Sequence, residues 1–347
     1  MNPTWQIYLQ SRNAVIEDNR VLHYGEDPAE LRNTRIDTDT VMVDLSHFGL
    51  IRFSGEDAHT FLQSQLSCDI RQVNSNTAQY GSYCTPKGRI LANFLLWQNN
   101  DFLMQLPADL CTTIQKRLSL FVLRAKVRLI DNSDTLIRIG IAGNNAAKLA
   151  EKTLGMPLDH HQHLGVIQNE SISLLCYAPN RYEFVTSVEH APTLWTHLSQ
   201  YAKPVGTFLW DWLEIRAGIP TILPVTQEQF IPQMVNLDAI NAISFKKGCY
   251  PGQEIVARTQ YLGKIKRRMY LAHVASTQSI MAGDELFNTE MANQPCGKIV
   301  NAAPSPHDGT DVLAVIQISS IKAGSIHWQT PSGPTLEIIP LPYPLGE

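Results

Sequence analysis

The stretch FKKGCYPGQEIVAR, from Phe245 to Arg258, places one thiol, Cys249, among groups that could activate it. Lys246, Lys247 and Arg258 could hold positive charge near the sulfur. A thiol with the ordinary pKa of about 8.5 is only slightly ionised at pH 7, and a cation that lowers its pKa makes the thiolate substantial. The pattern predicts a functional thiol at Cys249, with Lys247 and Arg258 as the cations that act on it.

The backbone of this stretch is suited to a ligand. Gly248 and Gly252 let the main chain approach a bound molecule closely, and Pro251 stiffens the turn between them. The loop contains no histidine to act as a general base, which argues against a Cys-His hydrolase. An isolated cysteine is more often a small buried hydrophobe, and that alternative stays open. We assign these loop residues to cofactor binding: Gly248, Tyr250, Gly252, Gln253 and Glu254.

The remaining cysteines do not predict a metal site or a disulfide framework. They contain no C-x-x-C pair and are scattered along the chain, at Cys68, Cys84, Cys111, Cys176 and Cys296. We expect these thiols to be reduced and packed in hydrophobic cores, with no metal bound by the protein's own side chains.

Length and composition describe an ordinary folded protein. The 347 residues, of which 44% are hydrophobic and 17% charged, are enough for two or three domains. A net charge of -4 argues against direct nucleic-acid binding over a broad surface. The N-terminus resembles neither a signal peptide nor a transit peptide, and no apolar run approaches the length of about 20 residues that crosses a bilayer. We expect a cytoplasmic protein with no membrane partner.

Short strands and amphipathic helices follow one another without strict βαβ alternation, which indicates an α+β fold. A strand is predicted at 50–55. A helix is predicted in TFLWDWLEIRAGIP, where Gly218 can cap it and Pro220 cannot continue it. After about Gly263 the chain consists of short runs broken by Gly, Pro, Ser and Asn, which indicates an all-β module, a small barrel. We predict two α+β domains and a C-terminal β-barrel domain, with the boundaries 1–125, 126–260 and 261–347.

Two segments, FIPQMVNLDAI and SFKKGCYPGQEIVAR, together resemble the signature of the YgfZ family of folate-binding proteins, relatives of the glycine-cleavage T-protein. The resemblance extends upstream through VDLSHFGLIRFSGEDAHTFLQSQLSCDI and downstream to PLPYPLGE. It implies T-protein-like folate-binding domains and a C-terminal small β-barrel around an opening that holds tetrahydrofolate. It also implies a role in the assembly or repair of iron–sulfur clusters and thereby in tRNA modification, with tRNA-thiolating iron–sulfur enzymes as clients.

The resemblance also suggests which residues hold the folate. A flat pterin needs aromatic or apolar faces to stack on and a few polar groups for its edge. The family pattern puts aromatic residues at the positions of Phe48 and Trp210, and these are the predicted stacking residues. Gln233 and Asn236 are candidates for binding the pterin edge. Core packing for the aromatic pair and turn roles for the amide pair are the alternatives.

Two departures from the T-protein pattern bear on the reaction. T-proteins carry an Asp-Asp pair where this chain has Ala92 and Asn93, and neither residue can act as the carboxylate that aminomethyl transfer requires. The acidic motif of the second T-protein domain is also absent, and PNRYEF occupies its place. A tetrahydrofolate-dependent aminomethyltransferase-like enzyme is therefore the alternative function, not the leading one.

A third class of function is an adaptor for nucleic acid or protein. It would act through GKIKRRM, where four cations cluster: Lys264, Lys266, Arg267 and Arg268. Such a run is more often a solvated strand and loop at the edge of a domain.

Overall fold

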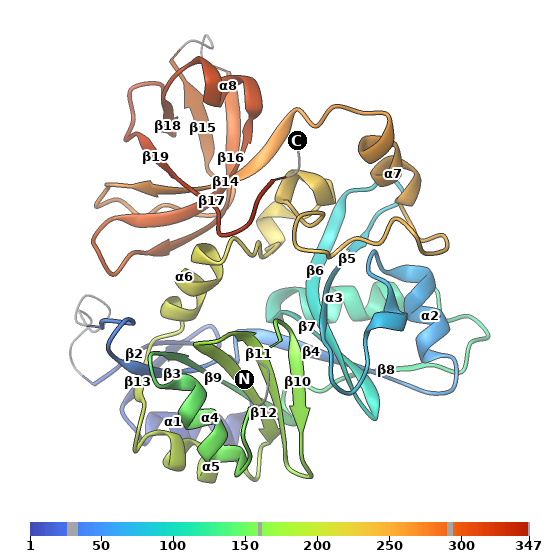
Figure 1. The fold of residues 1–347 in the computed structure, drawn as a ribbon, viewed down its shortest axis with the longest axis vertical. Helices are drawn as coiled ribbons and strands as arrows, with labels where there is room; N and C mark the ends of the chain where they lie inside the picture. The colour runs from blue at the N-terminus through green and yellow to red at the C-terminus, as the bar shows by residue number, and fades with distance from the viewer. Residues whose placement is uncertain (26–33, 159–161, 290–293, 346–347) are drawn as a thin grey trace. The chain divides into compact units, whose positions relative to one another are not determined.

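The computed structural model describes residues 1–25, 34–158, 162–289 and 294–345 (Figure 1). Its internal contacts divide the chain into two compact units. Unit 1 contains Met1–His59, Arg71–Gln79 and Leu95–Trp210, and unit 2 contains Thr60–Ile70, Tyr80–Phe94 and Asp211–Glu347. The three domain boundaries drawn from the sequence stay a prediction.

Unit 1 contains a six-stranded sheet in the order β10-β11-β12-β9-β3-β13. Neighbouring strands are antiparallel except β13, which runs parallel to β3. A turn around Asn180 joins β11 to β12. The strands are β3 (Thr40–Asp44), β9 (Leu136–Gly143), β10 (Gly165–Gln168), β11 (Ile172–Ala178), β12 (Arg181–Ser187) and β13 (Lys203–Val205).

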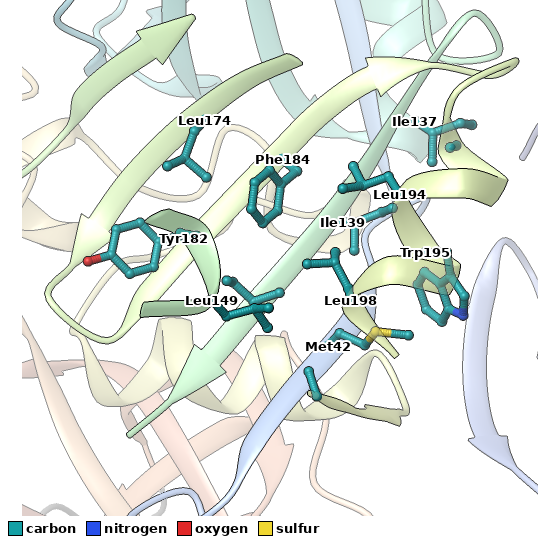
Figure 2. Close-up of a cluster of buried hydrophobic side chains, with 14 of the residues drawn as sticks. Met42, Ile137, Ile139, Leu149, Leu174, Tyr182, Phe184, Leu194, Trp195 and Leu198 are labelled. Atoms are coloured by element: carbon teal, nitrogen blue, oxygen red, sulfur yellow. The ribbon is translucent and has the colours of Figure 1, made fainter. Parts of the chain in front are cut away.

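Helices α4 (Ala146–Leu154) and α5 (Ala191–Leu198) cover one face of this sheet (Figure 1). Their apolar residues recur at helical spacing, so that each helix turns one stripe toward the strands. Figure 2 shows the resulting core, in which Leu198 lies beside Ile139 and Leu149 belongs to the same cluster. Helix α1 (Pro3–Gln10) adds Trp5 and Leu9 to the same core, and the hairpin β1 (Ala14–Glu17) with β2 (Arg20–Tyr24) follows it.

A second sheet in unit 1 pairs β4 with both β7 and β8, and β7 with the second half of β6. Helix α3 (Ala108–Ser119) buries four residues, Leu110, Cys111, Ile114 and Leu118. Gly49 permits its close approach to β4, because a Cβ there would lie 2.7 Å from the Cβ of Cys111. The strands are β4 (Phe48–Ser54), β6 (Ile90–Asn99), β7 (Asp101–Pro107) and β8 (Arg128–Asp131).

Unit 2 ends in a curled six-stranded sheet with the order β18-β15-β16-β17-β14-β19 (Figure 1). An isolated bridge between His327 and Thr335 links its two edges. This sheet has its own core, which includes Trp328, and helix α8 (Ile318–Ala323) adjoins it. The strands are β14 (Arg267–Val274), β15 (Glu285–Asn288), β16 (Pro295–Pro304), β17 (Thr310–Gln317), β18 (Ile326–Trp328) and β19 (Leu336–Ile339).

The rest of unit 2 is built from short elements. Helix α7 (Gln253–Tyr261) follows a long irregular segment with the 3-10 turns η3 (Pro224–Thr226) and η4 (Pro232–Val235). Strand β5 is Gln79–Cys84, and η2 is Ile70–Gln72. Helices α2 (Ala58–Gln65) and α6 (Phe208–Arg216) cross from one unit to the other along the chain.

These elements confirm the α+β class and a C-terminal module built on a β-sheet, although the prediction of an all-β module missed helix α8. Gly218 follows α6 with φ +69°, a conformation that glycine adopts readily, so the predicted end of this helix is also confirmed. No helix in the described ranges is long and apolar enough to span a membrane.

Candidate functional site

The segment that carries Cys249, residues 245–252, is here called the thiol loop; it leads directly into helix α7 of unit 2. Gly252 has φ +82°, and a Cβ at this position would lie 2.5 Å from the carbonyl oxygen of Thr85 and 2.7 Å from the Cα of Gly88. Only glycine fits there without a shift of the backbone. A Cβ on Gly248 would meet no atom within 4 Å. The fold therefore requires a glycine at position 252, whereas it leaves room for a side chain at position 248.

Lys247 points inward and anchors the thiol loop. Its ammonium group donates hydrogen bonds to the carbonyl oxygens of Leu66, at 2.7 Å, and Cys68, at 2.8 Å. Its Nζ also lies 5.4 Å from the ring centroid of Tyr250. Burial raises the pKa of the Tyr250 hydroxyl, which has no hydrogen-bond partner in the described part of the chain.

Cys249 is exposed, whereas the other five cysteines are buried. Burial raises the pKa of Cys68 and of Cys84 to about 12, and of Cys176 to about 11. The thiolate is the reactive form of cysteine, so the buried thiols are poor nucleophiles. Cys249 is therefore the thiol that a reagent in solution can reach.

Of the other polar residues of the motif, one forms a hydrogen bond within the loop and two are exposed. The side chain of Gln253 donates a hydrogen bond to the carbonyl oxygen of Lys247 at 3.4 Å, which closes the thiol loop onto the first turn of α7. Glu254 and Arg258 are exposed on α7. Arg258 is therefore accessible to a ligand, although its action on the thiol remains a prediction.

Gln233 and Asn236 are fully buried, and their amide groups bind the main chain. Gln233 donates to the carbonyl oxygen of Val256 at 2.7 Å, and Asn236 donates to that of Met269 at 2.9 Å. These bonds tie η4 to α7 and to β14. The amide oxygens of both side chains are buried without a partner among the described residues, so each retains one unused acceptor.

Phe48 and Trp210 belong to unit 1. Phe48 opens β4, is half-buried, and lies with its ring centroid 4.1 Å from that of His47. Trp210 is fully buried, and a Cβ on Gly140 would come within 2.5 Å of its indole ring. Its indole Nε1 has no hydrogen-bond partner among the residues described.

A group of buried polar and aromatic residues surrounds Trp210, and we call it the Glu183 cluster. The Tyr177 hydroxyl donates to the carboxylate of Glu183 at 2.6 Å, and the Gln105 amide donates to the same oxygen at 3.1 Å. The rings of Tyr177 and Trp210 meet edge to face with centroids 5.5 Å apart. The guanidinium carbon of Arg181 lies 5.0 and 5.4 Å from the centroids of these two rings.

Arg138 links this cluster to Phe48. Its guanidinium donates a hydrogen bond to the carbonyl oxygen of Phe48 at 2.7 Å. Burial lowers the pKa of Arg138, and the negative charges of Glu183 and then Asp44 oppose this shift. The negative charge of Glu183 therefore favours the charged form of Arg138 inside the unit.

The sequence analysis did not predict that five residues of this region belong to a site: Gln105, Arg138, Tyr177, Arg181 and Glu183. A signal was present for Arg138, which interrupts an otherwise apolar strand sequence, LIRIGIAG. Glu183 gives a weaker signal, because its strand sequence RYEFVTS also contains Arg, Thr and Ser. A charged residue in a buried strand is costly unless it has a partner. Register then decides the contact, because Glu183 lies opposite Gly140 in the β12–β9 pair, beside the Trp210 ring.

The predicted site residues thus fall into two groups. Unit 2 holds the thiol loop and the residues packed around it, and unit 1 holds Phe48 and Trp210 with the Glu183 cluster. Among the residues that the structure describes, no three His, Cys, Asp or Glu side chains gather closely enough to hold a metal ion.

Comparison with known proteins places this architecture in a family. Residues 23–241 match the family model described as the GCVT N-terminal domain. The chain is 33% identical over 280 residues to the tRNA-modifying protein YgfZ of Colwellia psychrerythraea. The aligned region covers 80% of this chain and 85% of that protein. It is 32% identical over 279 residues to the tRNA-modifying protein YgfZ of Photobacterium profundum, with 79% and 82% covered.

A solved structure has the same fold. The glycine cleavage system aminomethyltransferase T from Bartonella henselae aligns with a TM-score of 0.74 over 98% of this chain and 96% of that chain. At 16% sequence identity this likeness concerns the fold alone. The family model and the two curated relatives carry the assignment further: the chain belongs to the GCVT N-terminal domain family and, within it, to the YgfZ proteins.

Proposed function

We propose that this chain is a tetrahydrofolate-binding accessory protein that supports the assembly or repair of iron–sulfur clusters and, through them, tRNA modification. Its curated relatives are named tRNA-modifying proteins, which supports the last step. The observation that carries folate binding is the buried carboxylate of Glu183, which lies among aromatic rings and amide groups in unit 1.

The Glu183 cluster has the chemistry that the edge of a pterin requires. A pterin presents neighbouring N–H donors together with a carbonyl oxygen and ring-nitrogen acceptors. A carboxylate accepts paired N–H donors well, and such charge-assisted bonds are among the stronger ones. Gln105 Oε1 and Trp210 Nε1 are a buried acceptor and a buried donor without partners among the described residues. These groups fit the pterin; Glu183 would orient it and Trp210 would line its face. When bound, tetrahydrofolate supplies a carrier for one-carbon units.

Cys249 is the proposed functional thiol. It is exposed at the surface of unit 2, and Arg258 is exposed on the helix that follows. One cysteine cannot hold an iron–sulfur cluster, because such clusters normally take four thiolates. Its contact with a cluster would therefore be transient, with the client enzyme supplying the other ligands. Lys247 would contribute by holding the loop in shape through its bonds to the carbonyls of Leu66 and Cys68.

Calorimetry with tetrahydrofolate tests the folate site. We expect binding by the wild type and by Cys249→Ala, and at least tenfold weaker binding by Glu183→Gln and Trp210→Phe. Asp311→Asn is the matched control, because Asp311 is also a buried, hydrogen-bonded carboxylate but lies in unit 2. Melting temperatures of all variants separate loss of the ligand from loss of the fold. Absence of binding by the folded wild type would end the folate proposal.

The role of the thiol needs a separate assay. Cluster-dependent activity of a purified tRNA-thiolating iron–sulfur enzyme should be supported by the wild type and not by Cys249→Ser. Iron and labile sulfide should not accumulate stoichiometrically on either protein. If Cys249→Ser supported the activity of the client enzyme as well as the wild type, or if it retained stoichiometric iron and labile sulfide, the thiol would not be the group that contacts the cluster.

Aminomethyl transfer is the second candidate, because the fold is that of an aminomethyltransferase. At the position of the T-protein aspartate pair, Ala92 is buried and Asn93 is held by the segment after α6. The Asn93 amide donates to the carbonyl oxygen of Pro220 at 2.6 Å and accepts from the N–H of Ile222 at 2.8 Å. Neither residue can move a proton as a carboxylate does. Production of methylene-tetrahydrofolate above background from an amine donor would support this candidate over the first.

A further inference from the structure

An exposed aromatic ring lies at the end of helix α7 in unit 2. Tyr261 is 68% exposed, and its ring meets that of Phe245 edge to face, with centroids 6.0 Å apart and an interplanar angle of 72°. Leu262 beside it is 85% exposed. An aromatic ring that is held on one side by a second ring and open to solvent offers a platform on which a planar group can stack.

Several exposed cations lie close to Tyr261 in the sequence. Lys246 follows Phe245 along the chain, and Arg258 lies three residues before Tyr261, which places it on the same face of α7. Three more exposed cations follow the helix, at Lys264, Lys266 and Arg267. We call this face the aromatic-basic surface. None of its five cations forms an ion pair with a carboxylate in the described ranges of the chain.

The segment that carries this surface has a net charge opposite to that of the whole protein. Between Phe245 and Arg267 the sequence has one acid, Glu254, while the complete chain has a net charge of -4. The neighbouring Arg268 is not part of the surface, since it is buried and bound to Asp238 at 2.7 Å. This buried pair fixes the start of β14, so the exposed cations before it extend from an anchored strand.

We propose that the aromatic-basic surface binds an RNA loop, with its cations on the phosphates and an unpaired base stacked on Tyr261. Cations alone would also suit an acidic protein or an anionic membrane. An exposed aromatic ring among the cations favours nucleic acid, because every base offers a flat face to stack while neither alternative requires one. The choice of RNA over DNA rests on the proposed function, whereas the site itself lies in unit 2 and does not involve the Glu183 cluster.

Binding of fluorescently labelled, unfractionated tRNA to the full-length protein, followed by anisotropy without folate, tests the proposal. Affinity should fall steeply between about 50 and 200 mM salt, with a slope of roughly 0.7 to 0.9 per phosphate contact on logarithmic axes. Lys264→Glu with Lys266→Glu should lower that slope by about two. Tyr261→Ala should weaken binding about tenfold and leave the slope unchanged, and Tyr261→Phe should restore it.

The controls separate the specific surface from general charge. Lys148→Glu with Lys322→Glu makes the same change in net charge at two exposed lysines elsewhere and should leave tRNA binding unchanged. The proposal is overturned if the wild type does not bind tRNA at about 50 mM salt, if Tyr261→Ala binds as well as the wild type, or if polyglutamate competes as well as unlabelled tRNA. Binding to phosphatidylglycerol vesicles without binding to tRNA would also overturn it.

The same proteins distinguish this proposal from the folate proposal. The Lys264→Glu, Lys266→Glu protein should bind tetrahydrofolate like the wild type, and Glu183→Gln should bind tRNA like the wild type. A single-stranded DNA that bound more tightly than tRNA would refute the choice of RNA.

Discussion

The ammonium group of Lys247 lies 2.7 Å from the carbonyl oxygen of Leu66, which makes this lysine an internal anchor of the thiol loop. A second bond, to the carbonyl oxygen of Cys68, uses another of its three donors. A lysine two residues from a thiol suggests from sequence a charge that acts directly on sulfur. In the folded chain its hydrogen bonds go to the main chain, so its first effect is on the position of the loop.

Replacement of Lys247 by methionine should lower the free energy of unfolding by about 2 kcal/mol, because two buried carbonyl oxygens lose their donor. Lys246→Met is the matched control, since Lys246 is exposed and should change stability by less than about 0.5 kcal/mol. Urea denaturation measures both. Equal effects of the two substitutions would show that the buried bonds contribute nothing.

The glycines of the thiol loop should respond differently to substitution. Gly252→Ala should lower the free energy of unfolding by about 1 to 3 kcal/mol, because φ is +82° and the new methyl would lie 2.5 Å from the carbonyl oxygen of Thr85. Gly248→Ala meets open space and should change stability by less than about 0.5 kcal/mol. Thermal unfolding of the two variants checks this, and a destabilised Gly248→Ala would contradict it.

One thiol should react with Ellman's reagent in the native protein at pH 8. Cys249 is exposed, while burial raises the pKa of Cys68, Cys84 and Cys111 to about 12 and leaves them un-ionised at that pH. Cys249→Ser should remove the fast reaction. Denaturation should release the other five thiols. A fast reaction that persists in Cys249→Ser would mean that a buried cysteine becomes accessible in the native state.

Asp44 should make stability depend on pH in a definite direction. Burial raises the pKa of this carboxyl above its ordinary value of 3.8, against hydrogen bonds from Trp5 and Ser46. The folded protein therefore binds the proton more tightly than the unfolded chain does. This contribution is complete below pH 3.8 and is lost as the pH rises to the folded-state pKa.

Asp44→Asn has no titratable group at position 44, so the variant cannot lose this stability as the pH rises. The stability of the variant relative to wild type should therefore rise with pH from about 4 to the folded-state pKa and then stay constant. Denaturation by urea at a series of pH values measures the difference. Asp134→Asn, at an exposed position in the same unit, is the control, and its free energy of unfolding should change with pH as that of the wild type does. The prediction is wrong if Asp44→Asn also follows the wild type.

Local pattern was sufficient for much of the fold. The predicted strand at 50–55, which largely coincides with β4, and the predicted helix that ends before Gly218 each depend on residues close together in the sequence. The family signature likewise lies in two short segments. These features belong to single elements, where propensity and spacing act without help from distant parts of the chain.

The thiol loop was recognised from its residue types, but its internal roles were not. Lys246 and Lys247 are adjacent in sequence, yet the first is exposed and the second is buried on main-chain carbonyls. The basic run GKIKRRM is divided in the same way, because Arg268 pairs with Asp238 while Arg267 remains exposed. Burial depends on which side of a strand or loop meets the rest of its unit.

The sequence by itself determined the family, the α+β class, the β-sheet of the terminal module and the presence of an unusual thiol loop. Only the tertiary structure decided that Glu183 meets Tyr177 and Gln105, and that Arg138 reaches the carbonyl of Phe48. The physical reason is strand pairing. Residues from β7, β9, β11 and β12 become neighbours only when the unit is assembled, and the cost of burying their charges is met by contacts that no local pattern contains.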